Sequence, residues 1–400
     1  GGTAGKMREA GLTVTDVSEY TQFPECLDGR VKTLHPLVHG GLLGVRGNAE
    51  HERQMAENGI QKIDLVVLNL YAFEHTVQSG NSFGTCVENI DIGGPSMLRS
   101  SAKNHAYVAI ATAPSQYAEL MAEMSANNGC TSLDLRRRLA ARAFATSAAY
   151  DSAIAGYFAS QVPSPAPAVA RCYAPPTPLK YGCNPQQKPA GISPPLGGEL
   201  PFSVLNGSPG YINLLDALNA WQLVSELKEA LGLPAATSFK HVSPAGAAVA
   251  VPLTEEEREA YEVGGVELTP LALAYIKARN ADPMSSFGDF VAVSDEVDVA
   301  TAEVLRREVS DGIIAPGYSP EALAILSNKK GGKFVVLQAT AGYTPPPMEY
   351  REVYGAALSQ RRNDARITPA SLTDVRAGAS PLPEEAVRDL VVASVTLKYT

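Results

Sequence analysis

The chain has 400 residues, of which 45% are hydrophobic and 19% are charged. This length favours two or more domains, and the composition is that of ordinary globular cores, so a single small module and global disorder are excluded. The formal net charge of −9 argues against a protein that binds nucleic acid by neutralising its phosphates. Apolar runs such as 65–68 and 247–253 are far shorter than the roughly 20 residues of a transmembrane helix, so we expect a soluble protein without membrane contact.

The cysteines and the two ends of the chain bear on its context. The five cysteines form no C-x-x-C pair, which is typical of free thiols in a reducing compartment and predicts neither disulfides nor a zinc finger. The sequence starts at Gly1 without a methionine, and it stops shortly after the alternating apolar run 390–395. We therefore expect both ends to be truncated.

Residues 11 to about 160 alternate strand-like and helix-like patterns, which predicts a parallel sheet covered by helices. The apolar runs 63–70 and 107–111 are typical of fully buried strands. The T-x-x-E spacing from Thr85 to Glu88 predicts a capping box, and the Ala/Arg-rich segment 133–150 predicts a long helix.

The proline-rich segment 163–178 predicts a linker, because proline lacks the backbone donor that helices and central strands need. We therefore expect one domain over 1–162 and another over 179–400. In the second domain we expect a helix over 214–231 that ends at Gly232, and a strand over 237–242. The acidic segment 255–262 predicts an exposed helix face.

Some motifs have a simpler structural interpretation. Residues 80–84 match G-x-S-x-G with Ser82 as nucleophile, but the surrounding residues predict a loop before a capped helix, not a serine hydrolase. The start of the chain resembles a P-loop, but the spacing is one residue short and Met7 replaces the required hydroxyl. His35 and His39 have metal-ligand spacing, but Pro36 disfavours a continuous helix there, so we expect no metal.

Other segments carry chemistry suited to a phosphate-bearing ligand. Residues 29–33 combine a guanidinium, an ammonium and a hydroxyl, which could bind a phosphate monoester if the segment forms a loop, although a solvated basic turn is the simpler interpretation. Asp91 precedes Gly93 and Gly94, whose backbone N–H groups could face a ligand oxygen. Lys103 lies just before a predicted strand, where it could transfer a proton, and a surface lysine is the alternative.

In the second domain Lys240 and His241 are adjacent in a strand-like run. Neighbouring strand residues point to opposite faces, so both reach one substrate only if the strand ends or bulges there, as Pro244 and Gly246 suggest. Segments 284–290 and 310–312 add hydroxyls and carboxylates in turn-like settings. The residues alone thus indicate a two-domain enzyme that acts on a phosphate-bearing ligand.

Taken together, these segments resemble one family, the bifunctional purine-biosynthesis enzymes that join AICAR (aminoimidazole carboxamide ribotide) transformylase to IMP cyclohydrolase. The resemblance spans essentially the whole chain, in order. The matching stretches are 23–36, 69–71, 91–94, 102–105, 181–185, 213–222, 239–246, 285–289 and 310–312.

For residues 1–162 the resemblance implies a methylglyoxal-synthase-like α/β domain with a parallel sheet, lacking its first strand. It implies closure of formyl-AICAR (FAICAR) to IMP with loss of water, with Lys103 as the proton shuttle and backbone N–H groups after Asp91 stabilising the oxyanion. The ribotide phosphate would be held by Gly1, Gly2, Thr3, Arg30, Lys32 and Thr33. The base would be lined by Asn69, Tyr71, Asp91 and Ile92, with Tyr71 and Asp91 counted as catalytic.

For residues 179–400 the resemblance implies a cytidine-deaminase-like α/β transformylase domain without zinc, lacking its C-terminal part. It would pass a formyl group from 10-formyltetrahydrofolate to AICAR, with His241 taking the amine proton and Lys240 stabilising the transition state. The ribotide would be bound by Lys180, Tyr181, Asn213, Gly288 and Asp311.

The family is a homodimer, is usually cytosolic and needs no metal, although the start of this chain leaves a plastid leader open. Lys180 and Gln186 depart from the family's arginine and histidine, which would turn a bidentate phosphate grip into a single-point one. Most of the folate site would lie beyond residue 400, so formyl transfer by these 400 residues is not expected and their cyclisation activity is in question. The alternative function is a truncated, non-catalytic protein that binds purine ribotides or pairs with other subunits.

Overall fold

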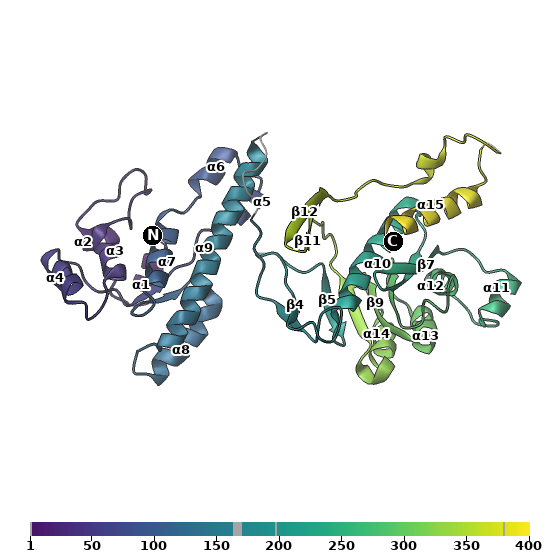
Figure 1. The fold of residues 1–400 in the computed structure, drawn as a ribbon, viewed down its shortest axis with the longest axis horizontal. Helices are drawn as coiled ribbons and strands as arrows, with labels where there is room; N and C mark the ends of the chain where they lie inside the picture. The colour runs from purple at the N-terminus through teal and green to yellow at the C-terminus, as the bar shows by residue number, and fades with distance from the viewer. Residues whose placement is uncertain (1, 163–169, 197, 379–380) are drawn as a thin grey trace. The chain divides into compact units, whose positions relative to one another are not determined.

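The computed structural model describes residues 2–162, 170–196, 198–378 and 381–400. The chain divides into two compact units, Gly1–Cys172 and Tyr173–Thr400 (Figure 1). Residues 163–169 of the expected linker lie outside the described residues, and strand β3 (Thr177–Leu179) begins inside the expected linker. This short strand pairs only with β4 (Ala190–Ile192), so its proline does not interrupt a central strand.

The first unit is mainly helical around one short pair of strands. Its helices are α1 (Gly2–Glu9), α2 (Val17–Thr21), α3 (Pro36–Leu43), α4 (Ala49–Glu57), α5 (Phe73–Gln78), α6 (Phe83–Glu88), α7 (Gly93–Lys103), α8 (Tyr117–Ala126), α9 (Leu133–Gln161) and the 3-10 helix Pro114–Gln116. Its strands are β1 (Leu65–Val67) and β2 (Ala109–Ala111).

The two strands pair in parallel, as the sequence predicts, with Leu65 opposite Ala109. The prediction of full burial is confirmed for β2 and wrong for β1, where Leu65 is 37% and Val67 52% exposed. The helices cover only one face of β1. Val66 points to that face and packs with Leu98 of α7 and Ala140 of α9.

Helix boundaries in this unit differ from the sequence prediction at two places. The helix predicted over 133–150 continues to Gln161, where the proline-rich segment follows. The predicted capping box at Thr85 is wrong, because α6 begins three residues earlier. Its N-cap is Ser82, whose Oγ accepts a hydrogen bond from the Thr85 N–H at 3.2 Å.

The second unit is built on a mixed sheet. Its strands are β3, β4, β5 (Phe202–Asn206), β6 (Ala235–Lys240), β7 (Ser243–Val249), β8 (Asp289–Val293), β9 (Ser310–Ala315), β10 (Val335–Ala339), β11 (Met348–Val353) and β12 (Ala356–Arg361). Its helices are α10 (Tyr211–Leu231), α11 (Glu255–Ala260), α12 (Pro270–Asn280), α13 (Val299–Arg307), α14 (Pro320–Ser327), α15 (Glu384–Lys398) and the 3-10 helices Lys329–Gly332 and Pro369–Leu372.

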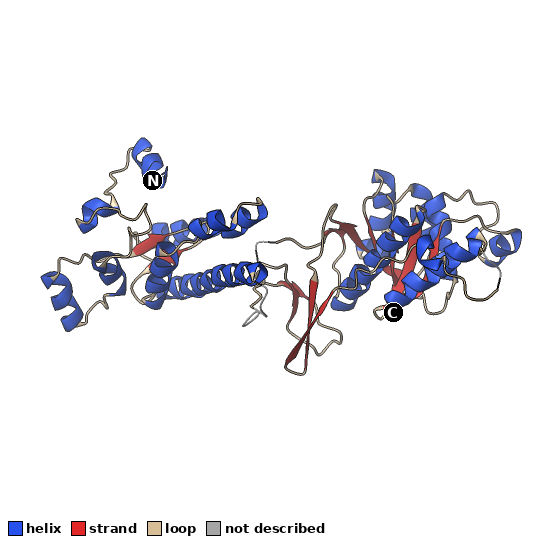
Figure 2. Ribbon diagram, turned by 90° about the horizontal axis from the view of Figure 1, so that it is seen from above, coloured by secondary structure: helices blue, strands red, loops and turns tan. Residues whose placement is uncertain are grey.

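The main sheet has six strands in the order β5-β10-β9-β8-β6-β7. Strands β8, β9 and β10 run parallel, while β5, β6 and β7 pair antiparallel to their neighbours. Helices lie on both faces of this sheet (Figure 2). Helices α10 and α15 share one hydrophobic cluster with the sheet, and α12, α13 and α14 share the other. The predicted α/β class is confirmed.

Two helices of this unit show where local sequence patterns suffice and where they do not. Helix α10 ends as predicted, with Gly232 in the left-handed conformation at φ 69°. The alternating apolar run 390–395 lies inside α15, where Val391 and Val395 are both buried. Residues four apart lie on the same face of a helix, and they also lie on the same face of a strand. Over a few residues, an alternating apolar pattern is therefore compatible with either a strand or a helix.

Candidate functional site

In the first unit, the start of α7 brings together residues that are far apart in the sequence. The Gly94 N–H donates a hydrogen bond to Asp91 Oδ1 at 2.7 Å, and the Asp91 N–H donates to the Tyr150 hydroxyl at 2.7 Å. A Cβ atom on Gly93 would lie only 2.5 Å from Thr33 Oγ1, and one on Gly94 would clash with the Asp91 carboxylate. The two glycines therefore allow Thr33 and Asp91 to approach the same stretch of backbone.

The two cations of the 29–33 loop are paired with carboxylates. Arg30 forms an ion pair with Glu88, and Lys32 Nζ lies 2.7 Å from Glu25 Oε2. The hydrogen bond with Glu25 raises the pKa of Lys32, and the nearby acidic groups of Asp16 and Tyr71 act in the same direction. An anionic ligand at this loop would have to compete with Glu25 and Glu88.

The remaining predicted contacts of the first site lie on exposed positions. Asn69 Nδ2 donates a hydrogen bond to the Tyr117 hydroxyl at 2.9 Å, and Tyr71 and Ile92 are largely exposed. Gly2 and Thr3 are exposed at the start of α1, and Gly1 lies outside the described residues.

Lys103 does not lie beside Asp91. It ends α7, whereas Asp91 precedes the start of that helix, and ten residues of helical rise separate the two helix ends by about 15 Å. Lys103 lines a shallow groove of about 280 Å³ with Leu43, Arg99, Ser100 and Phe144.

The two histidines with metal-ligand spacing have structural contacts instead. His35 is the N-cap of α3, where its Nδ1 accepts a hydrogen bond from the Leu37 N–H at 3.2 Å. His39 Nδ1 lies 2.9 Å from Ser100 Oγ, and burial lowers the pKa of this imidazole. Within the described ranges, no group of three or more His, Cys, Asp or Glu side chains could hold a metal ion.

In the second unit, strand β6 covers Ala235–Lys240, so the strand predicted over 237–242 starts and ends two residues too late. Lys240 pairs with Ser243 of β7, so His241 and Val242 form a two-residue hairpin turn. Both have positive φ, 53° and 65°, which is characteristic of a type I′ turn. Lys240 and His241 can face one substrate only if the strand ends or bulges here, and β6 does end at Lys240.

The carboxylate of Asp216 lies against this turn. Asp216 is on α10 and only 4% exposed, and its Oδ1 accepts a hydrogen bond from the Val242 N–H at 2.6 Å. Burial raises the pKa of Asp216 to about 6, although the hydrogen bond from Val242 and the charge of His241 oppose this shift. Asp216 was not among the predicted site residues. The available signal was a carboxylate within the apolar helix pattern that starts at Leu214.

The Lys240 ammonium points to the loop that precedes β8. Its Nζ donates a hydrogen bond to the Phe287 carbonyl, and a Cβ atom on Gly288 would lie 3.6 Å from Nζ. Gly288 has φ 75°, a conformation that glycine adopts without strain. The structure thus brings predicted residues Lys240 and Gly288 together.

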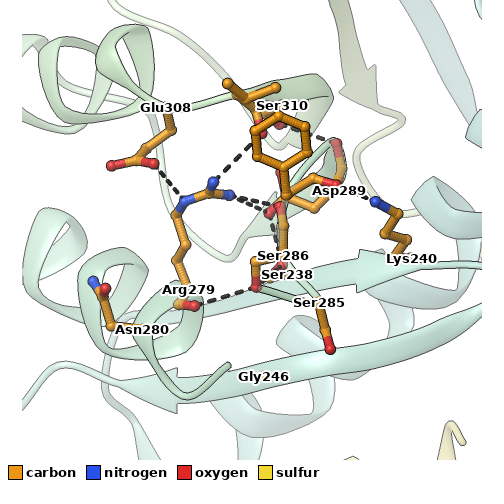
Figure 3. A network of polar contacts seen from close by, with 12 residues as sticks. Ser238, Lys240, Gly246, Arg279, Asn280, Ser285, Ser286, Asp289, Glu308 and Ser310 are labelled. Atoms are coloured by element: carbon orange, nitrogen blue, oxygen red, sulfur yellow. Dashed lines mark hydrogen bonds and ion pairs between the residues drawn. The ribbon is translucent and has the colours of Figure 1, made fainter. Parts of the chain in front are cut away.

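A buried polar network contacts this loop through Ser286 (Figure 3). Asp289 Oδ2 accepts a hydrogen bond from Ser238 Oγ at 2.6 Å and lies 3.2 Å from Arg279 Nη1. Arg279 also donates to the Ser286 carbonyl at 2.8 Å, and the Ser286 hydroxyl oxygen lies 2.8 Å from Ser238 Oγ. The network joins β6, α12 and β8, and sequence reasoning did not assign Arg279 to the site.

Two further predicted residues lie near Asp216. Asn213 is one helical turn before it on α10, where its Oδ1 accepts a hydrogen bond from the Gly210 N–H at 2.9 Å. Asp311, on β9, raises the pKa of Asp216 through its charge. Asp311 Oδ1 forms an ion pair with Lys330 Nζ at 2.6 Å, so the site holds a second lysine that sequence reasoning did not single out.

Lys180 and Tyr181 follow β3 on a separate hairpin. The Lys180 ammonium lies 5.7 Å from the centroid of the Tyr181 ring. Leu179, which precedes them, packs on the same hydrophobic cluster as α10.

No helix among the described residues is both long and apolar enough to cross a bilayer.

Comparisons with known proteins agree over the whole chain. A family model described as AICARFT/IMPCHase bienzyme matches residues 101–400, and a model described as MGS-like domain matches residues 1–96.

A protein of Caulobacter vibrioides named bifunctional purine biosynthesis protein PurH is 41% identical over 405 residues, covering 100% of this chain and 72% of the relative. Proteins of the same name from Ruegeria pomeroyi and Rhodospirillum rubrum are 40% and 39% identical, covering 98% and 100% of this chain and 71% and 72% of theirs. A crystal structure of ForH shares 34% identity over 40% of this chain and 82% of that chain, with a TM-score of 0.36. The chain belongs to the AICARFT/IMPCHase bienzyme family.

Proposed function

We propose that the chain carries the sites for the last two steps of purine ribotide synthesis, formyl transfer from 10-formyltetrahydrofolate to AICAR and closure of FAICAR to IMP. This proposal departs from the sequence-based expectation that these 400 residues do not transfer the formyl group. The family match and the relatives named bifunctional purine biosynthesis proteins support this proposal, and they do not favour the non-catalytic alternative. We assign cyclisation to residues 1–162 and formyl transfer to residues 179–400, the second domain being a cytidine-deaminase-like unit.

The observation that carries the formyl-transfer assignment is the turn at the end of β6. Neighbouring strand residues point to opposite faces, but the hairpin turn after Lys240 changes the direction of the chain at His241. His241 would accept the proton of the AICAR amine as that nitrogen attacks the formyl carbon, and Lys240 would stabilise the oxyanion that forms. The carbon–nitrogen bond to the folate then breaks, and the folate nitrogen takes a proton.

The ribotide of the second site would be bound by the residues around this turn. Gly288 lies beside the Lys240 ammonium, and Asn213 and Asp311 lie near Asp216. We add Lys180 and Tyr181 from the family resemblance, with Lys180 as a single-point phosphate contact.

In the first unit we place the cyclisation site at the start of α7. Asp91 would face the reacting formyl group together with backbone N–H groups that follow it, apart from the Gly94 N–H, which donates to Asp91 Oδ1. Asn69, Tyr71 and Ile92 would lie along the base. The phosphate would be held by the 29–33 loop through Arg30, Lys32 and Thr33, with Gly1, Gly2 and Thr3 added from the resemblance. The resemblance assigns the proton shuttle to Lys103. Because Lys103 lies at the other end of α7, we assign proton transfer at this end to Asp91 and submit Lys103 to a direct test.

We also propose a cytosolic homodimer that requires no metal, as the family resemblance implies. The function is tested by supplying the chain with AICAR and 10-formyltetrahydrofolate, or with FAICAR alone, and separating the products by chromatography. Formation of FAICAR and IMP supports the proposal. Ribotide binding in calorimetry with no product in either assay would favour the non-catalytic alternative.

A further inference from the structure

The turn after β6 is built from residues that do not favour its conformation. A type I′ turn needs positive φ at both central positions, and Asn-Gly or Asp-Gly is the usual pair. Here the pair is His241-Val242, and a β-branched residue at φ 65° is a backbone outlier. Residues in sparsely populated conformations persist only where the surrounding structure holds them, and they cluster at functional sites.

The group that holds this turn is Asp216. Its Oδ1 accepts the Val242 N–H at 2.6 Å, a short hydrogen bond of the kind that a charged acceptor makes. Asp216 and Val242 are 26 residues apart in sequence, so the contact links helix α10 directly to the hairpin. The positive φ values and the buried acceptor occur at the same point of the fold.

A buried carboxylate is a costly way to satisfy one N–H group. Burial raises the pKa of Asp216 to about 6, and the charges of Asp311 on β9 and Asp289 on β8 add to this shift, while His241 on the turn opposes it. An uncharged asparagine could accept the same hydrogen bond without a buried charge. Stability alone therefore does not explain an aspartate here.

We propose that Asp216 is a positioning residue for the Lys240–His241 pair. It fixes the turn through the Val242 N–H, and its negative charge interacts favourably with a positive charge on His241. This inference rests on the proposed function, in which His241 accepts the proton of the AICAR amine. A carboxylate close to the imidazole stabilises the imidazolium that forms when His241 accepts the proton. The hydrogen bond to Val242 therefore positions the turn before the reaction, and the negative charge stabilises the imidazolium during it.

The kinetic test uses Asp216→Ala, Asp216→Asn and the double variant Asp216→Ala/Val242→Gly. We expect Asp216→Ala to lower kcat for formyl transfer by about 100-fold with a much smaller change in KM for AICAR, since the ribotide contacts remain. Glycine adopts positive φ freely, so the double variant should recover part of the lost kcat. Asp216→Asn keeps the turn but loses the charge, and its kcat should lie between those of the wild type and Asp216→Ala.

Glu229→Gln is the matched control, because Glu229 is a carboxylate on the same helix whose exposed side chain pairs with Arg366 at 2.8 Å.

A spectroscopic test follows the turn independently of turnover. In the chain labelled with ¹⁵N-valine, the Val242 amide should titrate with a midpoint near pH 6 as Asp216 ionises. The midpoint should be absent in Asp216→Asn, and the amide resonance should move upfield in Asp216→Ala because the hydrogen bond is lost. A midpoint that persists in Asp216→Asn, or an unchanged resonance in Asp216→Ala, overturns the inference.

The two tests separate this inference from the proposed function. If the wild-type chain forms FAICAR and Asp216→Ala keeps the wild-type kcat, positioning by Asp216 is wrong and the proposed function stands. If the wild-type chain forms no FAICAR but the Val242 amide responds to Asp216 as described, the turn assignment stands, whereas the formyl-transfer assignment fails and with it the catalytic part of the inference.

Discussion

Asp91 and Lys103 lie at opposite ends of the same helix, α7, although the family resemblance assigns both to one reaction. Asp91 accepts the Gly94 N–H at the start of the helix, and Lys103 is its last residue. Side chains that exchange a proton with one substrate must come within hydrogen-bond reach of it, and a rise of about 15 Å separates the helix start, which follows Asp91, from Lys103.

Substitutions at the two ends of α7 test which end contributes to cyclisation. Asp91→Asn should lower kcat for IMP formation from FAICAR by about 100-fold or more, since the proposed site has this carboxylate in contact with the reacting atoms. Lys103→Ala should cause a much smaller loss. Initial rates at saturating FAICAR give the comparison, and the opposite ranking would move the proton-transfer role to the groove lined by Lys103, Arg99 and Ser100.

Glu25 competes with the ribotide phosphate for Lys32 in this account. Glu25→Gln should therefore strengthen IMP binding, by up to about fivefold, because the exposed ion pair no longer has to be broken. The gain should shrink as salt is added, since screening weakens charge interactions at exposed groups. Calorimetry on this variant and on the control Glu57→Gln provides the test. Equal or weaker binding in Glu25→Gln would show that Lys32 does not contact the phosphate.

The buried carboxylate of Asp216 makes stability depend on pH. Its pKa in the folded protein is raised to about 6, so its contribution to stability is complete at low pH and is lost as the pH rises through about 6. Asp216→Asn removes this dependence. We expect its free energy of unfolding to exceed that of the wild type by up to about 3 kcal/mol at pH 8, with the difference disappearing near pH 4. Urea unfolding of both proteins across this range is the measurement, and a variant less stable than the wild type at pH 8 would contradict the account.

The ion pair between Arg279 and Asp289 is buried, with side-chain exposures of 7% and 0%. Arg279→Met leaves the Asp289 carboxylate without its cation and should lower the free energy of unfolding by about 3–5 kcal/mol. The matched control is Arg306→Met, which breaks an exposed pair with Glu303 on α13 and should cost less than about 1 kcal/mol. Similar losses in both variants would mean that the network in contact with the 285–288 loop is not a stabilising element.

The sequence could predict elements whose signals are local. Gly232 and Pro234 mark the end of α10, and Ser132 caps α9 just before the predicted start of that helix. The end of β6 was misplaced because His-Val carries no turn signal, and it takes a positive φ only with help from α10.

The missing parts of the site depend on contacts between distant residues. Asp216 meets Val242 across 26 residues, and Arg279 meets the Asp289 carboxylate through the interior of the second unit. Neither partner can be inferred from spacing. The pairing of Arg30 with Glu88 is also long-range, so the sequence indicated a basic loop but not that its charge is already balanced.

In the proposed function, two separate sites in this chain act in succession on one ribotide. The most direct measurement supplies AICAR and 10-formyltetrahydrofolate to the wild type, His241→Ala and Asp91→Asn, and quantifies FAICAR and IMP over time. We expect IMP from the wild type, neither product from His241→Ala, and accumulated FAICAR from Asp91→Asn. Unchanged AICAR in the wild-type reaction, or IMP formation by His241→Ala at the wild-type rate, would contradict the proposed function.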